Sequence, residues 1–267
     1  LDQNNNYDER LGAESSGLPT LIAVMGEECL PVLRRELTAD LAAEVERRIK
    51  ITGWTAYDHF SRMRKEYSNE QRQALRKQVM GNSEAPLFVY LSQNIHPSTE
   101  YMRNISWEDR RKDDFFQYEM EVTRVVLEEA KKRRIFLLVK PHPGEKGPIN
   151  FTEQLLRSYQ TGHFLPANGC KTQDLLLTAV GILAGRSGCL VEACLLNRNV
   201  GAVLPNLPDK ERDTFLPVAL GAIPSAERWD EIPALIETIV NASWNGEVQQ
   251  KLAQDRKRFA VDGQAST

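Results

Sequence analysis

Short apolar runs alternate along the chain with longer stretches in which apolar residues recur every three or four positions. The runs have the length of single strands, and the stretches between them have the period of amphipathic helices. The expected strands cover residues 18–25, 48–52, 86–92, 135–139, 180–184 and 200–204. The expected helices cover 27–37, 115–134, 150–159, 172–178, 188–196, 232–242 and 246–259, with one or two more in 58–80. Because continuous apolar strands alternating with helices are typical of covered parallel sheets, the pattern predicts an α/β fold.

The turn-forming residues Gly81, Asn82 and Ser83 interrupt this pattern and mark a domain boundary. We expect a first domain over residues 1–82, including connecting helices, and a second domain over 83–247. Residues 248–267 are expected to form a helix that could cross back to the first domain. The chain begins at Leu1 with residues typical of the middle of a domain, so we expect the first domain to be incomplete.

The amino-acid composition argues against several classes of function for this protein. The chain has 267 residues, a net charge of −3, 41% hydrophobic and 27% charged residues, as in an ordinary globular protein. No basic excess indicates nucleic acid, and the four tryptophans form no stacking array. No apolar run approaches the roughly 18–20 residues of a membrane span. The four cysteines show no CxxC spacing, and with no signal peptide evident we expect a cytoplasmic protein.

Polar residues follow three of the expected strands. The carboxyl ends of parallel strands meet at one edge of a sheet, and ligands of doubly wound sheets bind there. We therefore take these residues as candidates for a binding site. They are Ser92 and Gln93 after the first strand, Lys140, His142 and Glu145 after the second, and Arg186, Ser187, Gly188 and Glu192 after the third.

The second of these loops reads Lys140-Pro141-His142-Pro143-Gly144-Glu145. Each proline fixes its own φ and lacks an N–H donor, so the histidine is held at the strand end. An imidazole with an ammonium can hold a phosphate, and an imidazole alone can act as acid or base. The alternative is a Pro-Gly turn with an accidental histidine.

The third loop, AGRSGCLVEA, joins a strand to a helix. A helix start presents free N–H groups that suit a diphosphate, and glycine permits close approach to the backbone. Glu192, about one turn into the helix, could reach a ribose diol. The alternative is that Ser187 caps the helix and Glu192 answers the helix dipole.

Absent motifs exclude other nucleotide chemistries. The sequence has no GxxxxGK[ST] loop of a P-loop ATPase and no GxGxxG after its first strand. Four scattered histidines and no DxD cluster give no evident metal site. Taken together, the three loops predict a nucleotide diphosphate site that needs no metal.

Several segments of the sequence resemble segments of the glycosyltransferases of the GT-B fold, which have two Rossmann-like domains. LDQNNNY, LPTLIAVMGEE and ITGWTAYD resemble the late half of the N-terminal domain, although Trp54-Thr55 stands where the pattern often has Asn-Pro. KPHPGE and SGCLVEACLLNRNVGAVLPN resemble the nucleotide-binding domain of bacterial capsule, sialic-acid and polyol-phosphate transferases. The same segments resemble the UDP-N-acetylglucosamine 2-epimerase group less closely.

The resemblance implies roles for several candidates. It places Lys140 and His142 at the donor phosphates, Ser187 and Gly188 at phosphate through the helix start, and Glu192 at the ribose or donor sugar. A general base would come from the first domain. Its local candidates are Asp2 and Asp58.

From these observations we predict a glycosyltransferase of polysaccharide biosynthesis that uses a nucleotide-activated sugar, without a bound cofactor. The acceptor would be a saccharide or a lipid-linked molecule. The basic cluster Lys131–Arg134 fits peripheral membrane contact or, alternatively, the dipole of its helix. Two other functions stay open: a nucleotide-sugar epimerase or hydrolase of the same fold, and a non-catalytic binding module.

Overall fold

A computed structural model describes residues 21–24, 30, 34, 37–52, 55–92, 114–142, 151–159, 162–166, 169–207, 218 and 223–241. The chain divides into two compact units. The first comprises Leu1–Arg62 with Gln249–Thr267, and the second comprises Met63–Val248.

The first unit contains a small parallel sheet with a helix before its second strand. Strand β1 (Ile22–Val24) pairs with β2 (Ile49–Ile51), and Ile22 lies opposite Ile49. Helix α3 (Ala39–Arg48) leads directly into β2. Its apolar side packs into a small core of Leu37, Ala42 and Val45, with Ile22, Leu41 and Ile49 against it. The acid in its first turn and the arginines in its last turn both complement the helix dipole.

Two helices follow, α4 (Thr55–Glu66) and α5 (Asn69–Met80). Ser68 lies between them and caps the start of α5. Its hydroxyl accepts a hydrogen bond from the N–H of Gln71, and the side-chain oxygen of Gln71 accepts one from the N–H of Ser68. This capping box satisfies two donors that a helix start otherwise leaves free. The Tyr67 hydroxyl donates to the Asp174 carboxylate at 3.4 Å, which joins the start of α5 to the body of the second unit.

The second unit is built on a six-stranded parallel sheet. Its strands are β3 (Leu87–Leu91), β4 (Phe136–Lys140), β5 (His163–Phe164), β6 (Gly181–Ala184), β7 (Asn199–Val203) and β8 (Ser225–Ala226). They lie in the order β5-β4-β3-β6-β7-β8. Numbered within the unit, this is the order 3-2-1-4-5-6 of a Rossmann sheet, whose direction of winding reverses between its first and fourth strands. The expected α/β, Rossmann-like fold is thereby confirmed.

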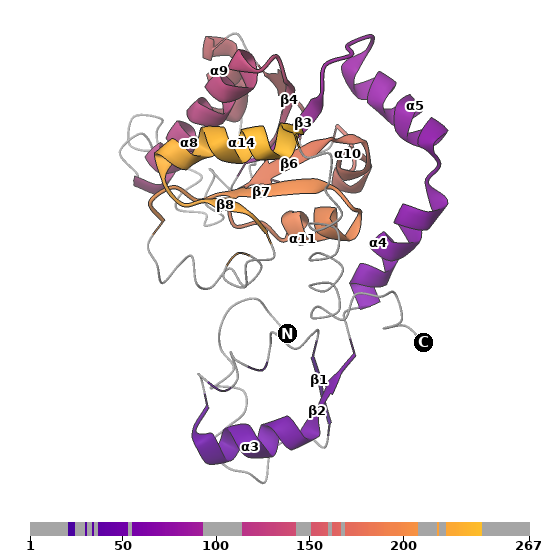
Figure 1. Cartoon of the computed structure of the whole chain (residues 1–267), viewed down its shortest axis with the longest axis vertical. Helices are drawn as coiled ribbons and strands as arrows, with labels where there is room; N and C mark the ends of the chain where they lie inside the picture. The colour runs from indigo at the N-terminus through magenta and orange to yellow at the C-terminus, as the bar shows by residue number, and fades with distance from the viewer. Residues whose placement is uncertain are drawn as a thin grey trace. The chain divides into compact units, whose positions relative to one another are not determined.

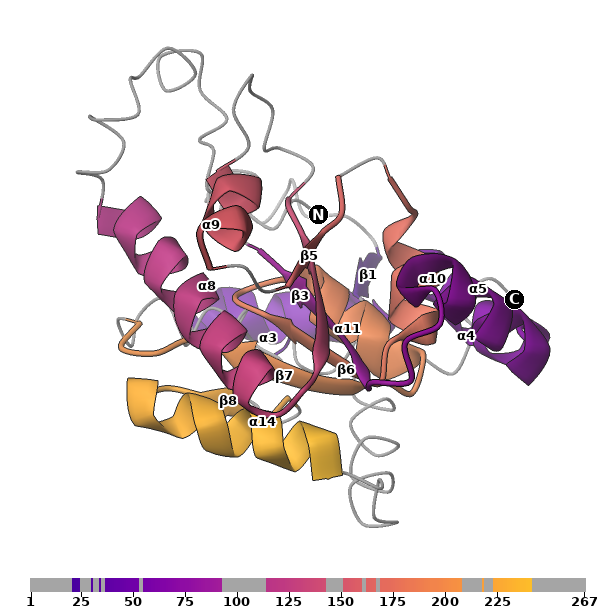
Figure 2. The same ribbon diagram turned by 90° about the horizontal axis from the view of Figure 1, so that it is seen from above.

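Helices cover both faces of this sheet (Figure 1 and Figure 2). On one face lie α8 (Asp114–Lys132), α9 (Phe151–Tyr159) and α14 (Ile232–Asn241), the last preceded by the short helix η2 (Trp229–Glu231). On the other lie α10 (Thr172–Thr178) and α11 (Gly188–Leu195). Every residue of β3, β6 and β7 is buried, as expected for strands covered on both sides.

Small residues let α14 approach the sheet closely. A Cβ on Gly181 of β6 would lie 2.6 Å from Ile239 and 2.6 Å from Phe88. A Cβ on Gly201 of β7 would lie 2.6 Å from Ile239. Glycine is therefore needed at both positions for packing rather than for backbone conformation.

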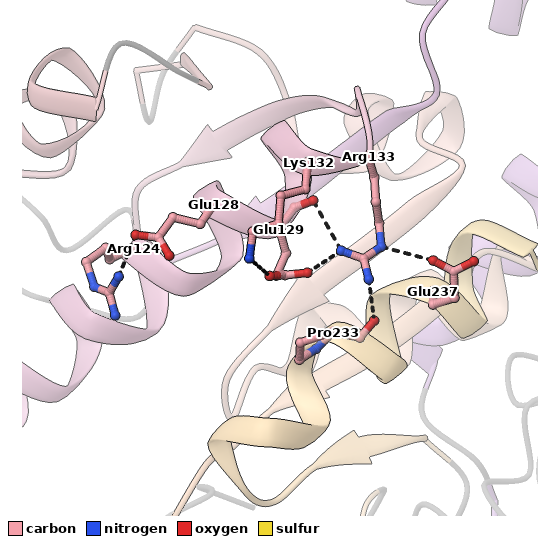
Figure 3. Close-up of polar contacts among 7 residues, drawn as sticks. All are labelled: Arg124, Glu128, Glu129, Lys132, Arg133, Pro233 and Glu237. Carbon is pink, nitrogen blue, oxygen red and sulfur yellow. Dashed lines mark hydrogen bonds and ion pairs between the residues drawn. The ribbon is translucent and has the colours of Figure 1, made fainter.

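A polar network joins the end of α8 to α14 (Figure 3). Arg133 donates to the buried carboxylate of Glu129, to Glu237 at 3.0 Å and to the carbonyl of Pro233 at 3.2 Å. Lys132 also pairs with Glu129, at 2.6 Å. Two members of the basic cluster Lys131–Arg134 thus have internal carboxylate partners.

Candidate functional site

The three polar loops leave the sheet at one edge. Strand register places Leu91, the last residue of β3, opposite Lys140 at the end of β4 and opposite Ala184 at the end of β6. The segments that follow these strands therefore start level with one another. Strands β3 and β6 are also the two strands between which the winding reverses, and this is where sheets of this kind bind their ligands.

Ser92 follows β3 at this edge. Its N–H donates to the carbonyl of Lys140 at 3.1 Å, which continues the pairing of β3 and β4 by one residue. The side chain is 4% exposed, and its hydroxyl has no hydrogen-bond partner among the described residues. A buried hydroxyl in this position can donate to a ligand oxygen.

Lys140 is the last residue of β4 rather than the first residue of the loop. Leu137 and Val139 belong to the core beneath α8, α9 and α14, so alternation directs Lys140 to the face covered by α10 and α11. Only 3% of the residue is exposed. Burial lowers the pKa of its ammonium, whereas the nearby thiols of Cys170 and Cys189 act in the opposite direction.

His142 lies two residues beyond β4 and is exposed to solvent at the edge. Partial burial of the imidazole lowers the pKa of His142 below its ordinary value. The lowered pKa favours the neutral form of the ring. In that form it offers one N–H donor and one acceptor nitrogen, which suits proton transfer or hydrogen bonding better than charge pairing.

The start of α11 forms the part of the edge that follows β6. Ser187 is the N-cap, and its hydroxyl oxygen accepts a hydrogen bond from the N–H of Cys189 at 3.3 Å. The structure thus shows the helix cap that was the alternative to a binding role for Ser187, and the serine hydroxyl keeps its own proton to donate to a ligand. A Cβ built on Gly188 meets no atom of the described residues within 4 Å outside its own helix turn and chain neighbours, so among them the first residue of the helix faces open space. Arg186 is exposed in the same turn.

Glu192 lies about one turn further along α11 and is half-buried. Burial raises the pKa of its carboxyl group. The same carboxylate contributes to the raised pKa of Cys189, after the larger effect of that thiol's own burial, so the two side chains are neighbours. A half-buried carboxyl beside a helix start is a hydrogen-bond acceptor suited to a ligand hydroxyl.

Three of the predicted site residues, Asp2, Gln93 and Glu145, lie outside the described residues. Asp58 belongs to the first unit, in the first turn of α4. It is 3% exposed, and neither carboxylate oxygen has a hydrogen-bond partner among the described residues.

One contributor to the edge was not predicted from the sequence. Cys170 lies just before α10, and its thiol is close enough to Lys140 and Asp174 for both charges to act on its pKa, after the larger effect of burial. The spacing of the cysteines carries no signal of this. It follows only from the packing of α10 and α11 on the same face of the sheet.

Metal-binding clusters and membrane-spanning helices are both absent from the described residues. No cluster of three or more histidine, cysteine, aspartate or glutamate side chains that could hold a metal ion occurs among them. None of the helices they form has the length and apolar composition that crossing a bilayer requires.

The chain is similar to solved structures of known proteins, but not to any family model or curated sequence. No protein-family model matches the sequence, and no curated protein matches it. The wall teichoic acid polymerase TagF has a similar structure, with a TM-score of 0.53 and 14% identity over 97% of this chain. So has the UDP-GlcNAc 2-epimerase of Neisseria meningitidis bound to UDP-GlcNAc, with a TM-score of 0.56 and 16% identity over 98% of the chain.

A glycosyltransferase of Rickettsia africae ESF-5 is also similar, with a TM-score of 0.55 and 10% identity over 92% of this chain. The chain spans 58% of the TagF chain, 64% of the epimerase and 61% of the Rickettsia protein. At such identities the likeness shows the fold. It confirms the GT-B-type architecture that the sequence motifs indicated.

Proposed function

We propose that this protein is a GT-B-type glycosyltransferase that binds the diphosphate of a nucleotide-activated donor at the carboxyl edge of the second unit. One observation carries the proposal. The ends of β3, β4 and β6 lie level at the reversal point of the sheet, and they bring Ser92, His142 and the start of α11 to one edge. Similarity to a teichoic acid polymerase, an epimerase bound to UDP-GlcNAc and a glycosyltransferase supports it.

The proposed chemistry is displacement at the anomeric carbon with a nucleoside diphosphate as leaving group. Negative charge would develop on the leaving phosphate and be stabilised by the α11 dipole, the Ser187 hydroxyl and the Lys140 ammonium. Glu192 would accept hydrogen bonds from the donor's ribose or sugar hydroxyls. We propose no metal for this step, because the cationic and dipolar groups of the edge would supply the stabilisation.

His142 would act as a neutral hydrogen-bond donor to a phosphate oxygen. Its lowered pKa also lets it accept a proton near pH 7, which a glycosyl transfer needs from the attacking hydroxyl. A base from the first unit is the alternative that the sequence resemblance implied, and Asp58 is its described candidate.

A thermal-shift panel tests binding directly. We expect one of UDP, CDP, GDP, CMP or ADP to raise the melting temperature by several degrees, since a ligand selective for the folded state stabilises it by mass action. No shift with any nucleotide at millimolar concentration would count against the proposal. The nucleotide that binds then selects the nucleotide sugar for product analysis.

Two substitutions locate the site. His142→Ala and Glu192→Ala should each weaken nucleotide affinity by roughly 10-fold or more, because each removes a hydrogen bond to a charged or polar ligand group. His163→Ala is a matched control, since burial likewise lowers the pKa of His163 but the residue lies in the edge strand β5. Unchanged affinity in both site variants would contradict the assignment.

Epimerisation is the second candidate, favoured by the similarity to two UDP-GlcNAc 2-epimerases. Incubation with the matching nucleotide sugar separates the two reactions. Epimerisation or hydrolysis proceeds without an acceptor, whereas transfer requires one. Binding without any turnover would instead support a non-catalytic module.

A further inference from the structure

The fold explains only part of the basic cluster at the end of α8. Lys132 and Arg133 both pair with the buried carboxylate of Glu129 (Figure 3). Lys131 and Arg134 are exposed, and among the described residues their side chains form no hydrogen bond or ion pair. The dipole of α8 favours cations in its last turn, which accounts for Lys131. It does not account for Arg134, which lies beyond the end of the helix.

Arg134 occupies a position that usually holds glycine. Its φ is 54°, its N–H donates to the carbonyl of Lys131 at 3.2 Å, and the N–H of Ile135 donates to the carbonyl of Ala130 at 2.9 Å. These bonds form a Schellman motif with Arg134 at the left-handed residue. The residues of positive φ that end α5 and α11 are a glycine and an asparagine, the types that this conformation favours. An arginine here makes the helix end less stable, which indicates a use for its charge.

Further residues lie beside Arg134 at the amino edge of the sheet. The pairing of β3 with β4 and with β6 begins within one residue of the same level, so the residues that precede these strands share an edge. Val180 directly precedes β6 and is 36% exposed. Arg198 directly precedes β7 and is half-buried. With about 4.8 Å between neighbouring strands, the row from Arg134 to Arg198 spans roughly 15 Å.

These residues form a locally basic surface on a chain whose net charge is −3. Lys132 contributes to it, because 66% of its side chain stays exposed despite the pairing with Glu129. An exposed acid, Glu84, lies in the turn before β3 and reduces the local charge by one. The members of this amino-edge surface are Lys131, Lys132, Arg134, Val180 and Arg198.

We propose that the amino-edge surface docks on an anionic lipid membrane. Each basic residue held near an anionic bilayer strengthens binding several-fold. Cations spread along a row with an exposed valine among them fit a layer of lipid headgroups, whereas a single polyanionic strand is typically held in a groove. The surface is independent of the proposed donor site, which lies at the carboxyl edge of the sheet.

Co-sedimentation of the whole chain with lipid vesicles tests this proposal. Vesicles that contain phosphatidylglycerol are compared with vesicles of phosphatidylcholine alone, at low and at high salt, because salt screens exposed charges. The variants are Arg134→Gly and Glu84→Gln. Lys171→Gln is the matched control, since it removes an exposed lysine that precedes α10, away from the end of that helix that leads into β6.

We expect the wild type to sediment with the phosphatidylglycerol vesicles at low salt and to be released at high salt. Arg134→Gly should bind these vesicles about fivefold more weakly. It should nevertheless melt at or above the temperature of the wild type, because glycine adopts a positive φ freely. Glu84→Gln should bind more tightly by a similar factor, and Lys171→Gln should bind as the wild type does.

Two results would overturn the proposal directly. One is a wild type that does not sediment with the phosphatidylglycerol vesicles, and the other is equal binding by Arg134→Gly and Lys171→Gln. Soluble polyphosphate is tested beside the vesicles. A wild type that binds polyphosphate but no vesicles would identify a soluble polyanion as the partner and would also overturn the assignment to a membrane.

Discussion

A substitution at Gly188 should lower the affinity for a ligand without lowering the stability of the protein. Gly188 is the first residue of α11, and a Cβ built there meets no atom within 4 Å from the part of the chain that the structure describes, apart from its chain neighbours and its own helix. Gly188→Ala should therefore leave the fold intact. Since alanine restricts the unfolded chain more than glycine does, the variant should be as stable as the wild type or more stable by about 0.4–1 kcal/mol.

Nucleotide binding should respond in the opposite direction. A phosphate that accepts a hydrogen bond from the start of α11 comes within contact distance of this position, and a methyl group would push it away. We expect affinity to fall at least tenfold, about 1.4 kcal/mol. Calorimetric titration with the nucleotide identified by thermal shift measures the affinity, and the melting temperature without ligand measures the stability.

Gly181→Ala is the matched control, because its Cβ would lie 2.6 Å from both Phe88 and Ile239. That variant should lose about 1–3 kcal/mol of stability through overpacking. Where it still folds, it should bind nucleotide with the wild-type affinity. The reasoning is refuted if Gly188→Ala binds nucleotide as tightly as the wild type does.

Three further predictions concern stability. Glu192→Gln should melt above the wild type at pH 7, because burial raises the pKa of Glu192 and so penalises the charged carboxyl of the wild type; this advantage should shrink as the pH falls through the raised pKa and be gone below about 4.5, and equal differences at pH 7 and pH 4 would contradict this. Arg133→Gln should lower the free energy of unfolding in urea by about 1–2 kcal/mol, because it removes one partner of the buried Glu129. Arg124→Gln, which breaks half-exposed ion pairs on the same helix, should lower it by about 0.5 kcal/mol or less. Equal losses in the two variants would show that the burial of Glu129 is unimportant. Ser68→Ala should cost about 1 kcal/mol by removing the α5 cap, and Ser68→Asp, which restores a capping acceptor, should recover most of it; no loss in the alanine variant would contradict the capping role.

The periodicity of apolar residues was sufficient to predict the long helices and strands of the second unit. The five-residue strands β3, β4 and β7 and the helices that cover them emerge within one or two residues of the expected positions. Each is buried on both faces, and this leaves an uninterrupted apolar run in the sequence. The two-residue strands β5 and β8 have no such run, because so short an edge strand is defined by its partner rather than by its own residues.

Helix α3 was missed although its signal is present. Leu41, Ala42 and Val45 have helical spacing, and Thr38 stands at the N-cap position. The separate helix expected at residues 27–37 lies mostly outside the described residues, although Leu30 and Arg34 within it are helical. The expected helix at 246–259 also lies outside them.

The site illustrates a different limit. Sequence order shows that Lys140 follows an apolar run, but it does not show to which face of the sheet the side chain points. That depends on register, and register here buries the ammonium beside Cys170 and Cys189 instead of placing it in the loop. The contact of α5 with α10 was equally inaccessible, because the two helices are far apart in sequence and meet only in the folded chain.

Hydrogen–deuterium exchange with and without nucleotide tests the central claim most directly, because it locates the ligand without any substitution. The account predicts slower exchange at the backbone amides at the start of α11, around Gly188, and around His142 after β4, with no change around Arg198, which precedes β7 at the opposite, amino edge of the sheet. A nucleotide that binds but leaves the amides around Gly188 and His142 exchanging at their free rates would contradict it.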